Sequence, residues 1–370
     1  MSESNIITRK EIDKLQEDLK QGYGVPSHWY HDNNIFELEK KAIFEENWQY
    51  VCPGEKVKEA NSCVAGRIAD VPVIVARGKD GVLRGFLNMC KHRGHQILQE
   101  DGKKATLTCP YHAWSYSLEG NLRSVPECLE SDGINKSKHS LTPIALHEWG
   151  GCVYGNLNTE APSWNDSFPE FSDMLKVRKF DETGEGYSFL RRFEFDINAN
   201  WKIWWDNHIE CYHCSRIHGA TFGAAFSTGP ENRIPFEGDK FFSNYFPESE
   251  SSDDSNSLRA KKYNSLTLFP GVLCLQQSDI MVASQTTPTG PETCRYTIDF
   301  YAEKTSNPTV VERWFDVYIQ TYKEDIAAVE AVQRCMRTDR MPRNRLVPSQ
   351  EPTVVSATRN LLDALRSKVD

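Results

Sequence analysis

Two short segments each pair a cysteine with a histidine. Cys90 and His92 stand in CKHRG, and Cys109 and His112 stand in CPYHAWSY. Each segment can therefore supply one thiolate and one imidazole to a metal. A Rieske [2Fe–2S] centre needs two thiolates on one iron and two imidazoles on the other. The pairing predicts that these four residues bind such a cluster.

A structural zinc site is the alternative for this set of ligands. Two cysteines and two histidines also hold tetrahedral zinc, but the usual spacing places cysteine near cysteine and histidine near histidine. In this chain each cysteine is instead followed closely by its own histidine. The spacing favours the iron–sulfur cluster.

A second group of potential ligands follows in the segment NWKIWWDNHIECYHCSRIH. Glu210 and His213 are three residues apart, so they would share one face of a helix. His218 could reach the same point if that helix ends near Ser215. Two imidazoles and one carboxylate leave positions on Fe(II) at which O2 can bind. The segment predicts a mononuclear iron site that takes a further carboxylate from elsewhere.

Asp325 is the predicted third iron ligand. It lies in the long proline-free segment 309–341, which should be helical. A carboxylate on a mainly apolar helix face is costly to bury unless it is paired or bound to a metal. Glu324 is the main rival. At helical spacing Asp325 falls in line with Trp314, Tyr318, Thr321, Val329 and Val332.

Three other residues near the second group are not expected to bind the iron. His208 would point away from His213 on a helix, so a surface or interface position is expected. Cys211 and Cys214 offer soft thiolates, which do not belong to an iron site built from nitrogen and oxygen ligands, so both are assigned to packing. Four more cysteines are expected to be buried free thiols: Cys52, Cys63, Cys128 and Cys152.

Periodic patterns predict the elements that position these ligands. Apolar residues at helical spacing predict helices at residues 9–21, 35–48 and 353–368, besides the one at 309–341. Short β-prone runs between glycine and proline turns predict a compact antiparallel β domain from about residue 50 to residue 158.

These elements suggest three parts of the chain. We expect N-terminal helices at 1–47, the cluster-binding domain at 48–158 and the iron-binding domain at 159–370. The Ser- and Asp-rich segment 248–257 should form a solvated loop.

Charge and composition argue against several classes of function. The net charge of −9 disfavours binding to nucleic acid or to an anionic membrane. No apolar run approaches the roughly 18 residues that suggest a membrane span, and the N-terminus shows no export signal. We therefore expect a cytoplasmic protein, in which the eleven cysteines are more often reduced or metal-bound than paired.

The two motifs together resemble those of Rieske non-haem iron oxygenase α subunits, the ring-hydroxylating oxygenase family. CKHRG with CPYHAWSY resembles the cluster motif of that family, and NWK…DNxxECYHCxxxH resembles its catalytic motif. The resemblance implies an α+β fold, with a Rieske [2Fe–2S] antiparallel β domain and a helix-covered antiparallel-sheet catalytic domain. It also implies that His213 and His218 bind the iron.

The resemblance gives Glu210 a bridging role. The acid at this position would join the iron site of one subunit to a cluster histidine of the next, because a carboxylate bonded to both imidazoles fixes both rings. The family commonly has Asp here. With Glu at this position, the motif resembles that of the branch that includes carnitine oxygenase and glycine betaine monooxygenase. Asn207, one helical turn earlier, is expected to support this arrangement.

The predicted reaction is monooxygenation of a small quaternary ammonium compound similar to carnitine or betaine, leading to N-demethylation or C–N cleavage. Hydroxylation or dihydroxylation of an aromatic acid is the alternative reaction. A third hypothesis is an electron carrier that uses only the cluster. Four aromatic residues near the motif are candidates to hold the cation: Trp204, Trp205, Tyr263 and Phe269.

Electrons must come from a partner protein. The chain has neither a G-x-G-x-x-G dinucleotide turn nor the C-x4-C-x2-C run of a plant-type ferredoxin. We expect a separate flavin- or ferredoxin-type reductase that takes electrons from NAD(P)H. The resemblance further implies a homotrimer in which the cluster of one subunit serves the iron of the next.

Overall fold

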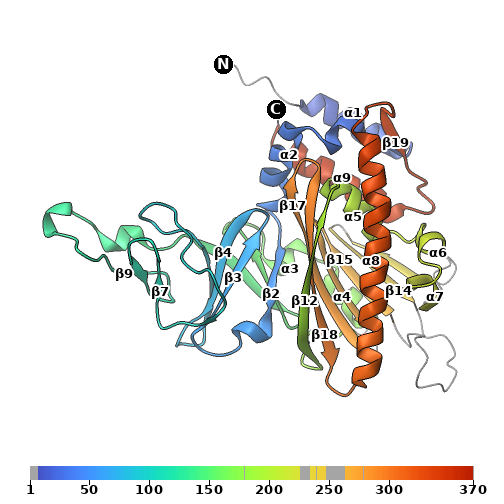
Figure 1. Ribbon diagram of the computed structural model, residues 1–370. Helices are drawn as coiled ribbons and strands as arrows, with labels where there is room; N and C mark the ends of the chain where they lie inside the picture. The colour runs from blue at the N-terminus through green and yellow to red at the C-terminus, as the bar shows by residue number, and fades with distance from the viewer. Residues whose placement is uncertain are drawn as a thin grey trace. The chain divides into compact units, whose positions relative to one another are not determined.

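The computed structural model describes residues 7–178, 180–225, 234–238, 240–246, 263–277 and 279–369. The chain divides into two compact units, one formed by Glu45–Ala161 and the other by Met1–Phe44 with Pro162–Asp370 (Figure 1). The sequence placed the corresponding limits at 47/48 and 158/159. The loop predicted at 248–257 lies outside the described residues.

The smaller unit is built on an antiparallel sheet with the spatial order β2-β11-β10-β5-β4-β3-β6. Strand β4 shows why this sheet forms. Val73 and Val75 face one apolar core and Ile74 and Ala76 face the other, as the alternation of a strand dictates. The strands are β2 (Gln49–Pro53), β3 (Ser62–Ile68), β4 (Val71–Arg77), β5 (Leu83–Leu87), β6 (Gly102–Lys103), β10 (Pro143–Trp149) and β11 (Cys152–Asn156).

A smaller antiparallel sheet in the same unit carries one of the cysteine–histidine loops. Its strands are β7 (Leu107–Thr108), β8 (Ser115–Tyr116) and β9 (Leu122–Ser124). Residues 109–114 form the connection between β7 and β8, and the other loop follows β5. The predicted antiparallel β domain is therefore confirmed.

The larger unit contains another seven-stranded antiparallel sheet, ordered β12-β18-β17-β16-β15-β14-β13. One of its two longest pairings joins β12 to β18, with Phe193 opposite Ile298. The strands are β12 (Tyr187–Ile197), β13 (Ile234–Glu237), β14 (Phe241–Phe246), β15 (Tyr263–Leu268), β16 (Val272–Gln277), β17 (Ile280–Gly290) and β18 (Thr293–Glu303).

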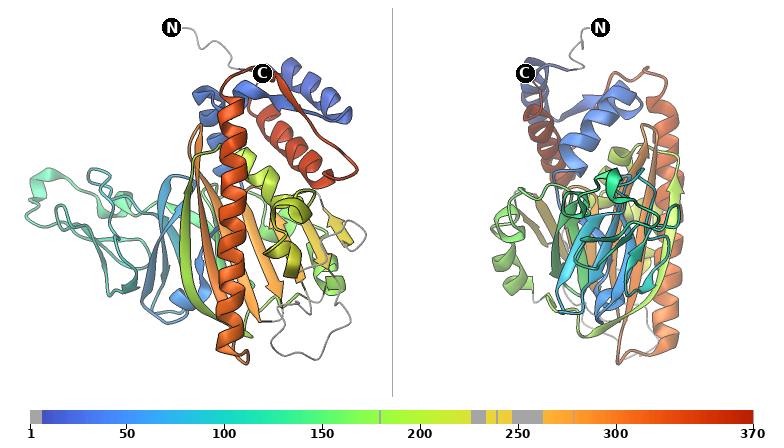
Figure 2. Two further views of the ribbon diagram at one scale, coloured as in Figure 1. Left: turned by 45° about the vertical axis from the view of Figure 1, so that its right-hand side comes forward. Right: turned by 90° about the vertical axis from the view of Figure 1, so that its left-hand side faces the viewer.

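Helix α8 (Pro308–Met336) runs along one face of this sheet (Figures 1 and 2). The ring of Phe315 packs against Phe193 of β12 and Phe300 of β18, at centroid distances of 4.7 and 4.9 Å. The predicted stripe of Trp314, Tyr318, Thr321, Asp325 and Val329 is buried. Val332 is 41% exposed, so its inclusion in that stripe was wrong.

The remaining helices surround the site or close the ends of the unit. They are α1 (Arg9–Lys20), α2 (Asn33–Glu39), α3 (Trp164–Ser167), α4 (Phe171–Arg178), α5 (Trp201–Ile209), α6 (Cys214–Ile217), α7 (Phe222–Ala225) and α9 (Pro352–Arg366). A short strand pair, β1 (Tyr23–Pro26) with β19 (Arg343–Arg345), ties the N-terminal segment to the segment between α8 and α9.

The N-terminal helices belong to the larger unit. Helix α1 begins with a capping box between Thr8 and Glu11 and contacts α9. The helix predicted at 35–48 is shorter than expected: α2 ends at Glu39 and a π-helical stretch, Lys40–Phe44, follows. No helix in the described parts of the chain is long and apolar enough to cross a membrane.

Candidate metal centres

The smaller unit brings the four cluster residues together. Cys90 and Cys109 are 3% and 2% exposed, whereas His92 and His112 are exposed with ring centroids 4.6 Å apart. The two cysteines are thus buried, and the two imidazoles lie at the surface. This donor set, with one buried pair and one surface pair, fits the two inequivalent irons of a Rieske cluster.

Neighbouring groups hold these ligands in place. The backbone N–H of Lys91 donates to the Tyr116 hydroxyl at 3.0 Å, and the same oxygen lies 3.3 Å from the Cys90 sulfur. Hydrogen bonds to cluster sulfurs tune the reduction potential. The buried ring of Trp114 stacks on His92 at a centroid distance of 5.1 Å, which fixes the plane of that imidazole.

The backbone around Glu210 differs from the prediction. Helix α5 ends at Ile209, Glu210 is extended with φ −118° and ψ 169°, and His213 precedes the short helix α6. The expectation that Glu210 and His213 share a helix face was therefore wrong. The turn still joins the two side chains, because the Glu210 carboxylate accepts hydrogen bonds from His213 Nδ1 and from the Tyr212 backbone N–H.

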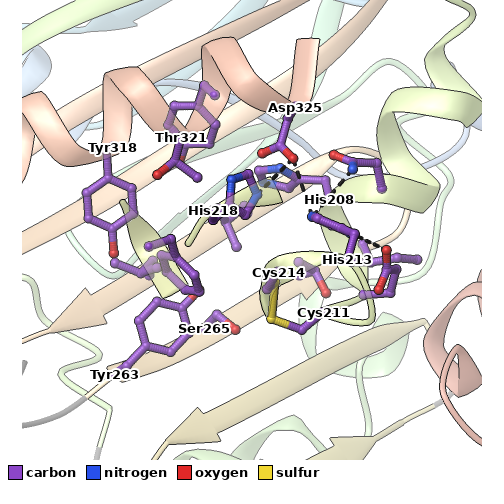
Figure 3. A pocket seen from close by; sticks show the side chains of 18 residues that line it. His208, Cys211, His213, Cys214, His218, Tyr263, Ser265, Tyr318, Thr321 and Asp325 are labelled. Atoms are coloured by element: carbon purple, nitrogen blue, oxygen red, sulfur yellow. Dashed lines mark hydrogen bonds and ion pairs between the residues drawn. A yellow bond between two sulfur atoms is a disulfide. The ribbon is translucent and has the colours of Figure 1, made fainter. Parts of the chain in front are cut away.

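Three ligand atoms converge from two elements of the larger unit (Figure 3). Asp325 Oδ1, carried by α8, lies 3.3 Å from His213 Nε2 and 3.0 Å from His218 Nε2. One potential ligand atom from each residue lies within 4.8 Å of the others. Asp325 is 5% exposed, and its Oδ1 accepts no hydrogen bond of suitable geometry. A buried carboxylate oxygen without such a hydrogen bond fits a metal ligand.

The carboxylates and imidazoles of this site shift each other's pKa. Burial alone would raise the pKa of Asp325, but the two neighbouring imidazoles outweigh it and hold that pKa below its ordinary value. Burial would lower the pKa of His213, but Asp325 and Glu210 raise it to about 9. The carboxylates thus favour the protonated form of His213, and the imidazoles favour the ionised form of Asp325.

Glu324 has a different place from Asp325. Its Oε2 accepts a hydrogen bond from His218 Nδ1 at 2.8 Å and another from the Thr221 hydroxyl at 2.7 Å. It therefore contacts the nitrogen of His218 that faces away from Asp325. Asn207 Nδ2 lies 3.4 Å from His213 Nε2, so Asn207 contacts the ligand group itself.

The triad forms part of the wall of a pocket, which offers about 80 Å³ to the centres of water-sized molecules. His208 also lines this pocket and is half-buried. Its ring stacks on Trp204, and its Nε2 lies 3.2 Å from the Tyr296 hydroxyl. Burial lowers the pKa of His208 to about 4, so the ring is neutral. The prediction of a surface or interface histidine was wrong because this face of α5 packs towards the sheet.

One of the four predicted cation-holding aromatics, Tyr263, lines the pocket. Trp204, Trp205 and Phe269 are buried, and the last two line a separate small cavity. The sequence did not single out Phe222, Tyr318 and Tyr322 as pocket residues, although all three line it. Tyr318 precedes Asp325 by two helical turns, so its spacing was a usable signal.

The two cysteines beside the triad form a disulfide, Cys211–Cys214. The sequence assigned both residues to packing and did not predict this bond, although the C-x-x-C spacing was a signal for a redox pair. The other nine cysteines, all within the described residues, form no disulfide. Cys128 is exposed rather than buried as predicted.

Two family models match the chain. "Ring hydroxylating alpha subunit (catalytic domain)" matches residues 185–367, and "Rieske [2Fe-2S] domain" matches residues 47–136. The chain belongs to the Rieske-type ring-hydroxylating oxygenase family. Membership of this family implies a Rieske [2Fe–2S] cluster and a mononuclear iron. The two candidate ligand groups described above fit these two centres.

Two similar proteins are named for carnitine and for choline. The carnitine monooxygenase oxygenase subunit of Acinetobacter pittii (strain PHEA-2) is 35% identical over 212 residues, 56% of this chain and 57% of that protein. The chloroplastic choline monooxygenase of Atriplex hortensis is 26% identical over 320 residues, 85% of this chain and 71% of that protein.

A solved structure extends the match to the whole fold. The quaternary ammonium Rieske monooxygenase CntA in complex with L-carnitine has a TM-score of 0.80 and 25% identity, over 95% of this chain and 97% of that one. In sequence, the chain spans little more than half the length of the carnitine monooxygenase subunits that it matches, 57% and 53% for two of them.

Proposed function

We propose that this chain is the oxygenase component of a Rieske monooxygenase that oxidises a small quaternary ammonium compound. The observation that carries the proposal is the triad of His213, His218 and Asp325 on the wall of a pocket lined by aromatic rings. Similar proteins named for carnitine, choline and glycine betaine support the substrate class.

The ligand assignment follows from the two centres. We assign Cys90 and Cys109 to one iron of the cluster and His92 and His112 to the other. His213, His218 and Asp325 hold the mononuclear iron, which supplies a site for O2 when it is bound. Glu324 orients His218, Glu210 orients His213, and Asn207 borders the ligand group.

The pocket suits a compact cation with a polar tail. The rings of Phe222 and Tyr263 lie 5.4 Å apart and those of Phe222 and Tyr318 lie 6.4 Å apart, so they form a continuous aromatic wall. Such ring faces attract a quaternary ammonium group. The hydroxyl groups of Ser265 and Thr321 also border the pocket and offer hydrogen bonds to the tail.

This placement accounts for the expected product. Oxidation of a carbon attached to the substrate nitrogen gives an unstable hydroxylated product, which breaks its C–N bond and releases an aldehyde. The protein's part is to hold the cation so that one such carbon faces the ligand group, and to exclude bulk water from it.

The assembly we propose is a homotrimer. His92 and His112 are exposed on the smaller unit, and the exposed Tyr212 lies beside Glu210 on the larger unit. The cluster edge of one subunit can therefore meet Glu210 of a neighbour, which would link the two centres through one carboxylate. Sedimentation velocity should give a trimer. A stable active monomer would contradict this assembly.

Electrons and location follow from the same proposal. A separate flavin- or ferredoxin-type reductase would transfer electrons from NAD(P)H to the cluster, and we propose a cytoplasmic location, where NAD(P)H is available. Purified wild-type protein should then turn over continuously only with such a reductase added. Steady turnover with NAD(P)H and the chain alone would contradict the need for a partner.

A single turnover identifies the substrate class without a reductase. Protein reduced chemically and loaded with Fe(II) would be exposed to O2 with quaternary ammonium compounds or aromatic acids, and products read by mass spectrometry. We expect oxidation of a quaternary ammonium compound with release of an aldehyde. Turnover of the aromatic acids alone would instead support the alternative, an aromatic-ring hydroxylating oxygenase.

A further inference from the structure

The Cys211–Cys214 disulfide encloses the turn that carries the iron ligand His213. We propose that these two cysteines are a site of reversible oxidation, a dithiol–disulfide pair whose state determines how firmly His213 and Glu210 are held. The proposal rests on the iron site of the proposed function. It adds a control by oxidation that neither the family nor the ligand set requires.

The pair is placed where it can act on the ligand. Cys211 directly follows Glu210, and Cys214 directly follows His213. Glu210 accepts hydrogen bonds from Tyr212 N–H and His213 Nδ1, so the position of the imidazole depends on the backbone of residues 210–213. A disulfide across this turn limits its conformations, whereas two free thiols leave it held only by hydrogen bonds.

Pairing is selective for these two residues. The other nine cysteines form no disulfide, including the exposed Cys128 and Cys335. Disulfides in a reducing compartment are usually transient, catalytic or redox-sensing rather than structural. A single disulfide beside the iron ligands, in a chain whose other cysteines form no disulfide, fits a reversible pair.

An external dithiol can reduce this disulfide. Cys211 is partly exposed and Cys214 is 5% exposed, so an external thiolate can attack the Cys211 sulfur and release Cys214 as the leaving thiolate. Cys214 then takes up a proton. A second thiol of the same dithiol reductant resolves the mixed disulfide and returns Cys211 to the thiol form.

Oxidation needs a two-electron acceptor, and we assign hydrogen peroxide to this role. The two thiols give two electrons and two protons to one H2O2, which forms the disulfide and two molecules of water. Peroxide is the two-electron product of O2 reduction that is not coupled to substrate oxidation. Both cysteines line the pocket in which O2 would be consumed, so they are among the first groups that escaping peroxide meets.

The test compares two states of the whole protein: the closed pair, in which Cys211 and Cys214 form the disulfide, and the open pair, in which both are thiols. Wild-type protein would be treated with tris(2-carboxyethyl)phosphine or with one equivalent of H2O2, freed of reagent, and alkylated for peptide mapping by mass spectrometry. Fe(II) binding and single-turnover product would be measured on each sample. We expect the closed pair to bind Fe(II) about tenfold more tightly, a change typical of altered support around a metal ligand.

Two variants provide the controls. The double variant C211S/C214S should bind Fe(II) as weakly as the reduced wild type and should not respond to either reagent. The double variant C128S/C335S, which removes two exposed thiols away from the site, should switch as the wild type does. If C211S/C214S does not fold, the reduced wild type still gives the open state.

Two results would overturn the proposal. One is alkylation of Cys211 and Cys214 after peroxide treatment without prior reduction, which would show that the pair does not form. The other is equal Fe(II) affinity in the closed and open states. Failure of the proposed function has a different outcome, because no quaternary ammonium compound would then be oxidised in either state while Fe(II) binding still responded to the pair.

Discussion

At the scale of single residues, the two acidic neighbours on α8 have different positions in the proposed iron site. Asp325 directs an oxygen towards both imidazoles, whereas Glu324 holds the outer nitrogen of His218. The sequence could rank these two residues because only Asp325 lies on the apolar stripe. It could not assign the hydrogen bond of Glu324, which depends on where the α6 segment places His218.

Removal of the Glu324 carboxylate should weaken iron binding. Glu324→Ala leaves His218 Nδ1 without its acceptor, and we expect a loss of about 10–100-fold in Fe(II) affinity, the usual effect of removing such a partner. Glu324→Gln keeps an oxygen that can accept the bond and should restore most of the affinity. Fe(II) titration of the apoprotein measures both, and wild-type affinity in Glu324→Ala would contradict the assigned role.

His208 should make stability depend on pH. The folded protein keeps this ring neutral down to about pH 4, while an unfolded histidine takes up a proton near pH 6.5. The unfolded state therefore binds more protons between these values, and the free energy of unfolding falls as the pH is lowered. From pH 7 to pH 5 the His208 contribution is roughly 1–2 kcal/mol.

Urea unfolding at both pH values tests this dependence. The variant His208→Gln cannot titrate, so the difference between its unfolding free energies at pH 7 and pH 5 should be smaller than in the wild type by roughly that amount. Other titrating groups affect both proteins equally and cancel in the comparison. An identical pH dependence in the two proteins would show that His208 is not held neutral by burial.

At the scale of elements, a buried ion pair fastens α2 to α5. Glu39 is wholly buried, Lys202 is 4% exposed, and their charged atoms lie 2.8 Å apart. Trp201 Nε1 also donates to Glu39 at 2.7 Å. Burial lowers the pKa of Lys202 and raises that of Glu39, so each charge depends on the other. The ion pair thereby fixes the start of α5, the helix that Glu210 follows, to the N-terminal helix α2.

Loss of one partner of this ion pair should lower the unfolding free energy more than loss of both partners. Lys202→Met leaves the Glu39 carboxylate buried without its counter-ion, and we expect a loss of about 3–5 kcal/mol in unfolding free energy. The double variant Lys202→Met/Glu39→Gln removes both charges and keeps an acceptor for Trp201, so it should recover much of that loss. Thermal unfolding of the three proteins measures the order, and equal stability of all three would contradict it.

Sequence patterns predicted most elements but not the turns between them. The apolar stripe of α8 and the alternation in β4 both express the period of their backbone, so their type could be inferred locally. The end of α5 at Ile209 could not, because Glu210 is held extended by hydrogen bonds to Tyr212 and His213 that form only in the folded turn. The orientation of His208 depends in the same way on Tyr296, almost ninety residues later in the sequence.

At the scale of the whole molecule, the chain carries the proposed cluster ligands on one compact unit and the pocket with the proposed iron ligands on the other. The candidate ligand residues of both centres could be named from the sequence because donor type and spacing are local properties. The pocket was not, because Phe222, Tyr263 and Tyr318 come from three distant elements and meet only in the fold. Substrate choice therefore depends on the least predictable part of the structure.

The most direct test of the central claim is a single turnover of the variant Asp325→Ala with a quaternary ammonium substrate, beside the wild type and the control Asp316→Ala. Asp316 is an exposed residue of the same helix. We predict that all three keep the visible absorption of a reduced Rieske cluster, that wild type and control release aldehyde, and that Asp325→Ala forms no product. Aldehyde from Asp325→Ala at the wild-type yield would contradict the claim that this triad is the site of oxygen chemistry.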